Sequence, residues 1–267
     1  MVKVGLQQNI LSSLAQLQNV LVAKGFTTGA RALGHDVPAV IVARPAGQPE
    51  DLIAAAEGAD VLFPATKRSL APLLSAYDAD VGLCGGFPWL ITQDAIDTPR
   101  LGIVNCHPTM LPKGRGPHPW AWAARTGETE VGLTFHFMDA SFDTGNVLAQ
   151  MPVAFEPDDT EETLIPKVEA AAFELLPEVF AKLEAGDKGV PQADGEYQHP
   201  FEPEYAIVDA SRSAAEVHRQ VRAWSFMPES SRIGPVLDGR RLVRTSLVEV
   251  DGAERLDCSD APLWIVE

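Results

Sequence analysis

The chain has 267 residues, of which 46% are hydrophobic, and its formal net charge is −16. This length and apolar content suit one large domain, or a main domain with a small addition. The negative charge counts against nucleic acid as the main partner, because binding to phosphates requires a basic face. No apolar run reaches the roughly 18 residues of a membrane span, and the first residues lack a signal-peptide pattern. We therefore expect a cytoplasmic protein without membrane contact.

The cysteines Cys84, Cys106 and Cys258 are scattered along the chain. Their spacing matches neither a disulfide framework nor a zinc site. The first strand is not followed by Gly-x-Gly-x-x-Gly, and there is no phosphate-binding loop that ends in Gly-Lys-Ser/Thr. We therefore expect no metal and no nucleotide cofactor of those kinds.

Short β-branched runs alternate with helical stretches through the first two-thirds of the chain. Strands are predicted at residues 37–43, 60–63, 80–84, 101–105, 132–138 and 147–154, and helices at 9–24, 50–57 and 68–77. Strands that alternate with helices indicate a mostly parallel sheet. The predicted fold class is therefore α/β, with a Rossmann-like sheet covered by helices.

The clearest helix is predicted at residues 160–185, where apolar side chains recur at three-four spacing and Pro177 should introduce a kink. Residues 187–205 are rich in glycine, proline and polar groups and indicate a linker. A short helix at 213–224 follows, and then Asp238-Gly239 and Asp251-Gly252, two hairpin signals. We therefore predict a catalytic domain at 1–190 and a small helix-plus-β subdomain at 200–267.

Polar residues follow the predicted strand at 101–105, which ends at Asn105. Ligands of open α/β sheets bind just beyond the carboxyl ends of strands. Asn105 and His107 are two residues apart, so on an extended backbone their side chains point the same way. A loop rich in glycine and proline comes next, at residues 108–119. This segment is the first candidate for chemistry.

The second candidate is the loop after the strand at 132–138, which contains Asp139 and Asp143 and closes with Asp-Thr-Gly. Asp143 is expected to reach His107 from a neighbouring strand. Such a trio suits acyl transfer to an amine, because Asn105 and His107 can stabilise negative charge on the formyl oxygen. Asp143 can keep His107 charged and oriented, and can help to remove the proton of the attacking amine.

The residue patterns of both segments resemble those of the folate-dependent formyltransferase family. The run Asn-x-His-Pro-Thr-x-Leu-Pro-x-x-Arg-Gly begins at Asn105, and Gly-x-Thr-x-His-x-x-Asp-x-x-x-Asp-Thr-Gly begins at Gly132. The family includes enzymes that formylate glycinamide ribonucleotide, methionyl-tRNA and sugars. The likeness is strong over residues 80–150 and looser elsewhere. One departure is Thr109, where the family usually has serine, and another is the Gln7-Gln8-Asn9 run after the first strand.

The resemblance implies that Asn105, His107 and Asp143 are catalytic and that 10-formyltetrahydrofolate is the donor, with no metal. It also implies that two segments line the folate pocket. Their residues are Phe87, Trp89, Leu90, Ile91, Met138, Asp139 and Ala140. Contacts with the acceptor are expected from Thr109, Arg115, His118 and His136, with a surface role for His118 and a packing role for His136 as alternatives.

The leading prediction is transfer of a formyl group from 10-formyltetrahydrofolate to the amine of a small molecule. Methionyl-tRNA formyltransferase is one alternative, because residues 213–224 resemble the helix that opens its C-terminal domain. A hydrolase that releases formate from the donor is a second, and a folate sensor without activity is a third. The sequence leaves the acceptor open, as well as the choice between a monomer and a homodimer.

Overall fold

The computed structural model describes residues 3–8, 26–42, 54, 56–87, 89–228 and 232–267. The chain divides into two compact units. The first unit comprises Met1–Arg115, Gly132–Val153 and Glu162–Tyr197, and the second comprises Gly116–Val131, Ala154–Glu161 and Gln198–Glu267. The domain boundary expected between residues 190 and 200 remains a prediction.

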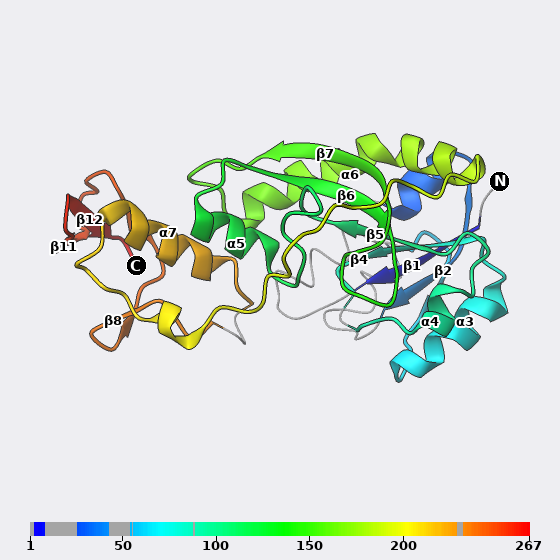
Figure 1. Ribbon diagram of the computed structural model, residues 1–267, viewed down its shortest axis with the longest axis horizontal. Coiled ribbons are helices and arrows are strands. Elements are labelled where there is room, and N and C mark those ends of the chain that lie inside the picture. Colours follow the sequence, from blue (N-terminus) through cyan, green and yellow to red (C-terminus); the bar gives the residue numbers. More distant parts are fainter. Residues whose placement is uncertain (1–2, 9–25, 43–53, 55, 88, 229–231) are drawn as a thin grey trace. The chain divides into compact units, whose positions relative to one another are not determined.

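The sheet of the first unit has seven strands in the order β3-β2-β1-β4-β5-β6-β7 (Figure 1). Their bounds are β1 Lys3–Gln8, β2 Asp36–Val42, β3 Asp60–Leu62, β4 Val81–Gly85, β5 Ile103–His107, β6 Glu130–Phe137 and β7 Val147–Ala154. The pairs from β3 to β5 are parallel, whereas β6 runs antiparallel to β5. The predicted α/β class is confirmed. Because the strand order reverses between β1 and β4, the carboxyl ends of the central strands form the expected ligand edge.

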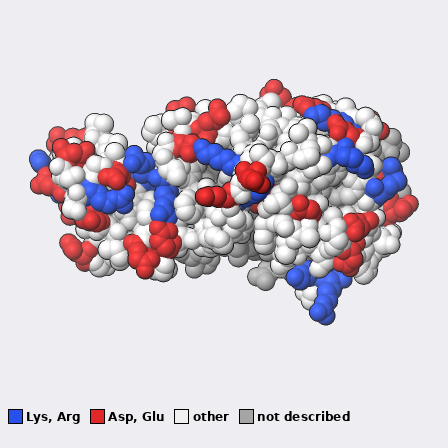
Figure 2. All heavy atoms as spheres, in the orientation of Figure 1, with Lys and Arg blue, Asp and Glu red and all other residues white. Residues whose placement is uncertain are grey.

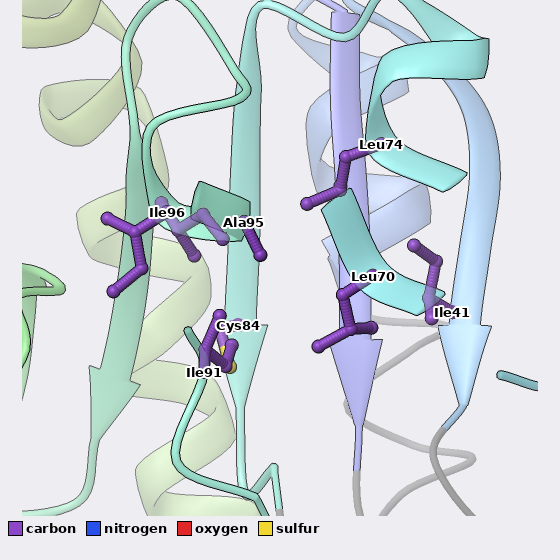
Figure 3. Close-up of a cluster of buried hydrophobic side chains, with 8 residues drawn as sticks. Ile41, Leu70, Leu74, Cys84, Ile91, Ala95 and Ile96 are labelled. Carbon is purple, nitrogen blue, oxygen red and sulfur yellow. The ribbon is translucent and has the colours of Figure 1, made fainter. Parts of the chain in front are cut away.

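Helices cover the sheet and bury its side chains. Helix α3 (Leu70–Tyr77), which follows the 3-10 turn η1 (Lys67–Ser69), and helix α4 (Gln93–Ile96) pack their apolar residues onto β2, β4 and β5. Figure 3 shows this cluster, whose members are Ile41, Leu70, Leu74, Cys84, Ile91, Ala95, Ile96 and Ile103. The cluster fixes the end of β4 from which the candidate donor-binding segment departs.

Helix α6 (Glu161–Glu184) buries a second set of apolar side chains. It is one continuous helix that includes both Pro166 and Pro177. His35 stacks on Phe180 of this helix with ring centroids 4.0 Å apart. A further helical segment covers residues 26–32. The helix predicted at 9–24 lies outside the described residues, and so does most of the one predicted at 50–57.

The second unit contains α5 (Pro119–Thr126), the 3-10 turn η2 (Pro203–Ala206) and α7 (Ala214–Ser225). Helix α7 matches the helix predicted at 213–224. It begins with a capping box, in which Ser213 accepts from the Glu216 amide while the Glu216 carboxylate accepts from the Ser213 amide. Val217 and Val221 of α7 pack against Leu263 of β12 (Pro262–Ile265). The small C-terminal sheet therefore shares a core with this helix.

One of the two predicted hairpins is present. Strands β8 (Val236–Leu237) and β9 (Arg240–Arg241) pair around Asp238 and Gly239, both with positive φ, as a two-residue turn requires. The hairpin prediction at 251–252 was wrong. Strands β10 (Thr245–Ser246) and β11 (Glu254–Asp257) flank that turn, but they lie on opposite sides of β12.

No helix in the described part of the chain is long and apolar enough to cross a membrane.

Candidate active site

Strand β5 places Asn105 and His107 on one face of the sheet. Asn105 pairs with Cys84 of β4 and with His136 of β6, and His107 pairs with Thr134. The strand extends two residues beyond the predicted end, because these polar residues continue the ladder with β6. The alternation of side chains therefore brings Asn105, His107 and His136 to the same end of the sheet.

Asn105 lies against a histidine whose tautomer the structure defines. His136 Nδ1 donates to the Phe137 carbonyl over 2.8 Å. In the neutral ring the other nitrogen, Nε2, is then an acceptor. It lies 3.2 Å from Asn105 Nδ2, which donates to it. His136 thus fixes the Asn105 amide, and the second hydrogen of Nδ2 is available to a ligand.

His107 has a distinct environment at each ring nitrogen. Nε2 donates to the Gly114 carbonyl over 2.9 Å. Gly114 has φ +80, and a Cβ there would lie 2.6 Å from the Thr109 side chain, so this loop conformation requires glycine. Nδ1 lies 3.6 Å from Asp143 Oδ1. The nitrogen that takes up the second proton therefore faces a carboxylate.

The loop that carries Asp143 is tightly folded. Asp143 has φ +56, a region that aspartate tolerates better than most residues. Within the loop, the Asp139 carboxylate accepts from the Ser141 amide and from the Thr144 hydroxyl. Gly145 passes so close to the Phe137 carbonyl that an added Cβ would lie 1.9 Å from its oxygen. Asp143 is therefore held at the end of β6.

The Asp143 carboxylate lies between two histidines. Its Oδ1 is 3.6 Å from His107 Nδ1 and 3.7 Å from His136 Nε2, and the centroids of the two imidazole rings are 6.4 Å apart. Burial, followed by the neighbouring His107, lowers the pKa of His136 to about 4. His136 is therefore neutral near pH 7, and the Asp143 carboxylate lies between this neutral ring and His107.

The depressed pKa of His136 predicts a pH dependence of stability. The ordinary pKa of histidine is 6.5. Below that pH His136 is protonated in the unfolded chain, but in the folded chain it stays neutral until about pH 4. The contribution of neutral His136 to the free energy of unfolding is fully present above pH 6.5 and is lost as the pH falls to 4. It amounts to about 3 kcal/mol. Urea unfolding of the wild type and of His136→Gln at several pH values measures it.

Other histidines titrate in both proteins, so only the difference between the two curves reports on His136. We expect the wild type to lose stability relative to His136→Gln between pH 6.5 and pH 4. A difference that stays constant over this range would contradict a neutral, buried His136.

The loop after His107 is tied to the sheet by Thr134, which is fully buried in β6. Its hydroxyl accepts from the Leu111 amide and from Gln150 Nε2, and it donates to the Thr109 carbonyl. The same Gln150 amide donates to the Leu111 carbonyl over 2.7 Å. This network fixes the start of the loop whose Gly114 carbonyl orients His107.

Replacement of Thr134 by valine is expected to destabilise the fold. The change keeps the shape but leaves buried donors and an acceptor without a partner, at a cost of about 2–3 kcal/mol in free energy of unfolding. Urea denaturation measures the loss. Thr126→Val is the control, because the exposed Thr126 hydroxyl bonds to carbonyls of its own helix and to the nearby Glu128 carboxylate and does not tie two buried segments together. Equal stabilities for the two variants would contradict the role of Thr134.

The residues expected to contact the donor lie in two segments at the ends of β4 and β6. Phe87 and Trp89 meet edge to face with ring centroids 5.6 Å apart, and with Met138 they pack, half-buried, on the core cluster. Ile91 is 2% exposed, so only its backbone can reach a ligand. The others are also near these ends: Leu90, Asp139 and Ala140. Half-buried apolar side chains at these strand ends suit a flat heterocycle such as a pterin.

The residues expected to contact the acceptor have different environments. The Thr109 hydroxyl is buried and has no hydrogen-bond partner among the described residues. Arg115 is buried, and its guanidinium is already bound by protein groups. His118 is half-buried in the second unit, before α5, and burial lowers its pKa. His136 lies beside Asn105. These acceptor contacts remain predictions.

Burial also affects the two thiols near the site. Burial raises the pKa of the Cys84 thiol to about 12 and also raises that of Cys106, so neither is a nucleophile near neutral pH. Among the described residues, no cluster of histidine, cysteine and carboxylate side chains could hold a metal ion.

One residue near the site escaped the sequence analysis. Gln192, from the segment interpreted as a linker, donates to the Asp143 and Gly145 carbonyls over 3.0 and 2.7 Å. The linker interpretation was wrong for this stretch, because Val190 and Gln192 bind it to the first unit. A polar residue in a stretch of glycine, proline and acids gives no sequence signal of such a contact.

The comparison with known proteins agrees with this geometry. The family model described as formyl transferase matches residues 39–180, a span that contains all three candidate catalytic residues. The chain belongs to the formyltransferase family. It is 38% identical over 160 residues to the methionyl-tRNA formyltransferase of Koribacter versatilis. The matched stretch covers 58% of this chain and 51% of that relative. The chain thus spans about half the length of the curated relatives it matches.

Solved structures show the same fold. Glycinamide ribonucleotide transformylase 1 from Symbiobacterium toebii superposes with a TM-score of 0.59 at 25% identity, over 73% of this chain and 95% of that one. HypX from Aquifex aeolicus in complex with tetrahydrofolic acid superposes with a TM-score of 0.69 at 18% identity. This match covers 99% of the present formyltransferase and 43% of HypX, and shows a shared fold across both units.

Proposed function

We propose that this formyltransferase transfers the formyl group of 10-formyltetrahydrofolate to a primary amine, with Asn105, His107 and Asp143 as its catalytic residues. The observation that carries the proposal is the ionic contact of 3.6 Å between His107 and Asp143, next to an Asn105 amide that His136 orients. The groups required for acyl transfer thus meet at the ligand edge of the sheet. Membership of the family supports the same reaction.

The role of each residue follows from its contacts. When bound, 10-formyltetrahydrofolate supplies an activated acyl group. The amine nitrogen forms a bond to the formyl carbon, and the bond to the folate nitrogen breaks. Asn105 Nδ2 donates to the formyl oxygen, and the charge of the His107 cation stabilises the negative charge that develops on that oxygen. Asp143 stabilises the His107 cation and accepts the proton that the amine loses, and this proton returns to the departing folate nitrogen.

The donor is proposed to bind between the two segments at the ends of β4 and β6. Half-buried Phe87, Trp89 and Met138 present apolar surface, while the backbone around Ile91 provides hydrogen-bonding groups. HypX is a protein of the same fold whose structure is in complex with tetrahydrofolic acid. Tetrahydrofolate is therefore the first ligand to test. Quenching of tryptophan fluorescence by tetrahydrofolate, compared between the wild type and Trp89→Leu, tests the location.

Methionyl-tRNA is one candidate acceptor. The curated relative named above is a methionyl-tRNA formyltransferase, and its similarity supports the same acceptor for this chain. The sequence of helix α7 also supports this acceptor, because it resembles the helix that opens the C-terminal domain of that enzyme. Binding of tRNA would depend steeply on salt, because basic side chains displace the counterions of the phosphates.

A small-molecule amine is the second candidate, and the charge of the second unit favours it. This unit contains nine arginines, no lysine and eighteen carboxylates. On the face drawn in Figure 2, the basic and acidic side chains of the described residues are interspersed. Several arginines are paired with carboxylates, including Arg125 with Glu202 and Arg212 with Glu216. A mixed surface of net negative charge is poorly suited to a polyanion.

One experiment tests the proposal and separates the acceptors. The purified chain is incubated with 10-formyltetrahydrofolate and either methionyl-tRNA or a panel of amino sugars, amino acids and hydroxylamines. We expect one acceptor to gain the mass of a formyl group, with tetrahydrofolate released in equal amount. Formate released without an acceptor would instead identify a hydrolase. Binding without turnover of any kind would indicate a sensor.

A further inference from the structure

Arg115 and Gln192 form a chain of hydrogen bonds behind the candidate catalytic residues. Both Nε and Nη2 of Arg115 donate to Gln192 Oε1, over 3.2 and 2.8 Å. The guanidinium also donates to the carbonyls of Gly195 and Ala193. Arg115 is only 8% exposed. It is therefore an internal anchor that binds the segment after Val190 to the loop after His107.

The amide of Gln192 continues this chain to the loop that carries Asp143. With its oxygen bound by Arg115, its nitrogen donates to the Asp143 carbonyl over 3.0 Å and to the Gly145 carbonyl over 2.7 Å. A buried arginine that binds the amide oxygen fixes the amide orientation, because guanidinium groups only donate. Gln192 is thus held with both donor hydrogens toward the Asp143 loop.

The same segment contacts this loop on both sides of Asp143. The ring of Tyr197 packs on Phe142 with centroids 5.6 Å apart. Val190 forms a backbone bridge to Val147. Asp143 itself has a left-handed backbone, which costs free energy unless the surroundings stabilise it. Residues 190–197 provide that stabilisation.

The chain of hydrogen bonds also connects the two partners of the ion pair. Arg115 directly follows Gly114, whose carbonyl accepts from His107 Nε2. Gln192 holds the backbone of Asp143, whose carboxylate faces His107 Nδ1. We propose that Gln192 is a positioning residue, held by Arg115, that sets the distance between His107 and Asp143. This inference rests on the proposed function, and it gives Arg115 a positioning role in place of an acceptor contact.

Two substitutions of Gln192 test the proposal. In Gln192→Glu the carboxylate still accepts from Arg115, but it has no hydrogen for the two loop carbonyls and repels them. Gln192→Met is of similar length, neutral and without a donor, so it separates loss of the hydrogen bonds from added charge. For both we expect kcat to fall by about 10- to 100-fold, as for small displacements of catalytic groups. The KM of the donor should change much less.

Asn146→Ala is the matched control. The Asn146 side chain donates to the Lys188 carbonyl over 2.8 Å, so it joins the same two segments without touching the Asp143 backbone. We expect its kcat to equal that of the wild type. Unchanged kcat in both Gln192 variants would overturn the proposal, as would a parallel loss of kcat and melting temperature in all three.

A crystal structure of Gln192→Met gives a result independent of activity. A His107 Nδ1 to Asp143 Oδ1 separation clearly longer than 3.6 Å supports the positioning role. An unchanged separation overturns it. If the wild type proves inactive with every acceptor, the proposed function fails, while this distance still decides what Gln192 does.

Discussion

Replacement of His107 by asparagine is expected to reduce kcat by about 100- to 1,000-fold, the loss typical of one oxyanion-stabilising donor. Asparagine removes the cation and cannot span from the Gly114 carbonyl to the Asp143 carboxylate, as the imidazole does. The proposed donor pocket lies in other segments, so binding of tetrahydrofolate should be retained. Steady-state kinetics with the identified acceptor and fluorescence titration with tetrahydrofolate measure the two effects.

His35→Asn is the matched control for this variant. His35 is also a buried histidine of the first unit, but it stacks on Phe180 of α6. Its replacement should lower the melting temperature and leave kcat unchanged. If His107→Asn kept wild-type turnover, His107 could not be the group that stabilises the formyl oxygen.

Replacement of Asp143 by asparagine is expected to reduce kcat by about 100- to 10,000-fold, the range for loss of a general acid–base group. Asparagine has the same shape and tolerates the left-handed backbone at this position, so the loop should keep its fold. What is lost is the charge that stabilises the His107 cation and accepts the proton of the amine. The pH dependence of kcat should change as well as its maximum.

Asp60→Asn is the control for this charge removal. Asp60 accepts from the Tyr77 hydroxyl at an exposed position of β3, and its replacement should leave kcat and its pH profile unchanged. A wild-type pH profile in Asp143→Asn would show that the carboxylate neither holds His107 nor receives the proton.

The sequence predicts most of the sheet and the identity of the candidate catalytic residues. Short β-branched runs locate β2 to β7 within about two residues, because burial dictates their composition. The two-residue spacing of Asn105 and His107 correctly places them on one face. Strand β5 nevertheless ends later than predicted, because its last polar residues pair with β6. A prediction based on apolar residues cannot detect this pairing.

Contacts between segments distant in the sequence could not be predicted. Gln192 reaches a carbonyl 49 residues earlier and accepts from an arginine 77 residues earlier. Nothing in its own segment indicates either partner. The turn at 251–252 fails for a related reason. Local turn chemistry indicates where the chain reverses, but the insertion of β12 between β10 and β11 depends on packing against α7.

Formyl transfer by the His107–Asp143 pair is the central proposal, and a single-turnover experiment tests it most directly. Wild type and Asp143→Asn are each mixed in excess with 10-formyltetrahydrofolate that is isotopically labelled at the formyl carbon, and with the acceptor that gains a formyl group. Mass spectrometry then follows the label. We predict rapid appearance of the label as an amide on the acceptor with the wild type, and a rate slower by orders of magnitude with the variant. Label that leaves as formate with the wild type, or that reaches the acceptor equally fast with both proteins, would contradict the account.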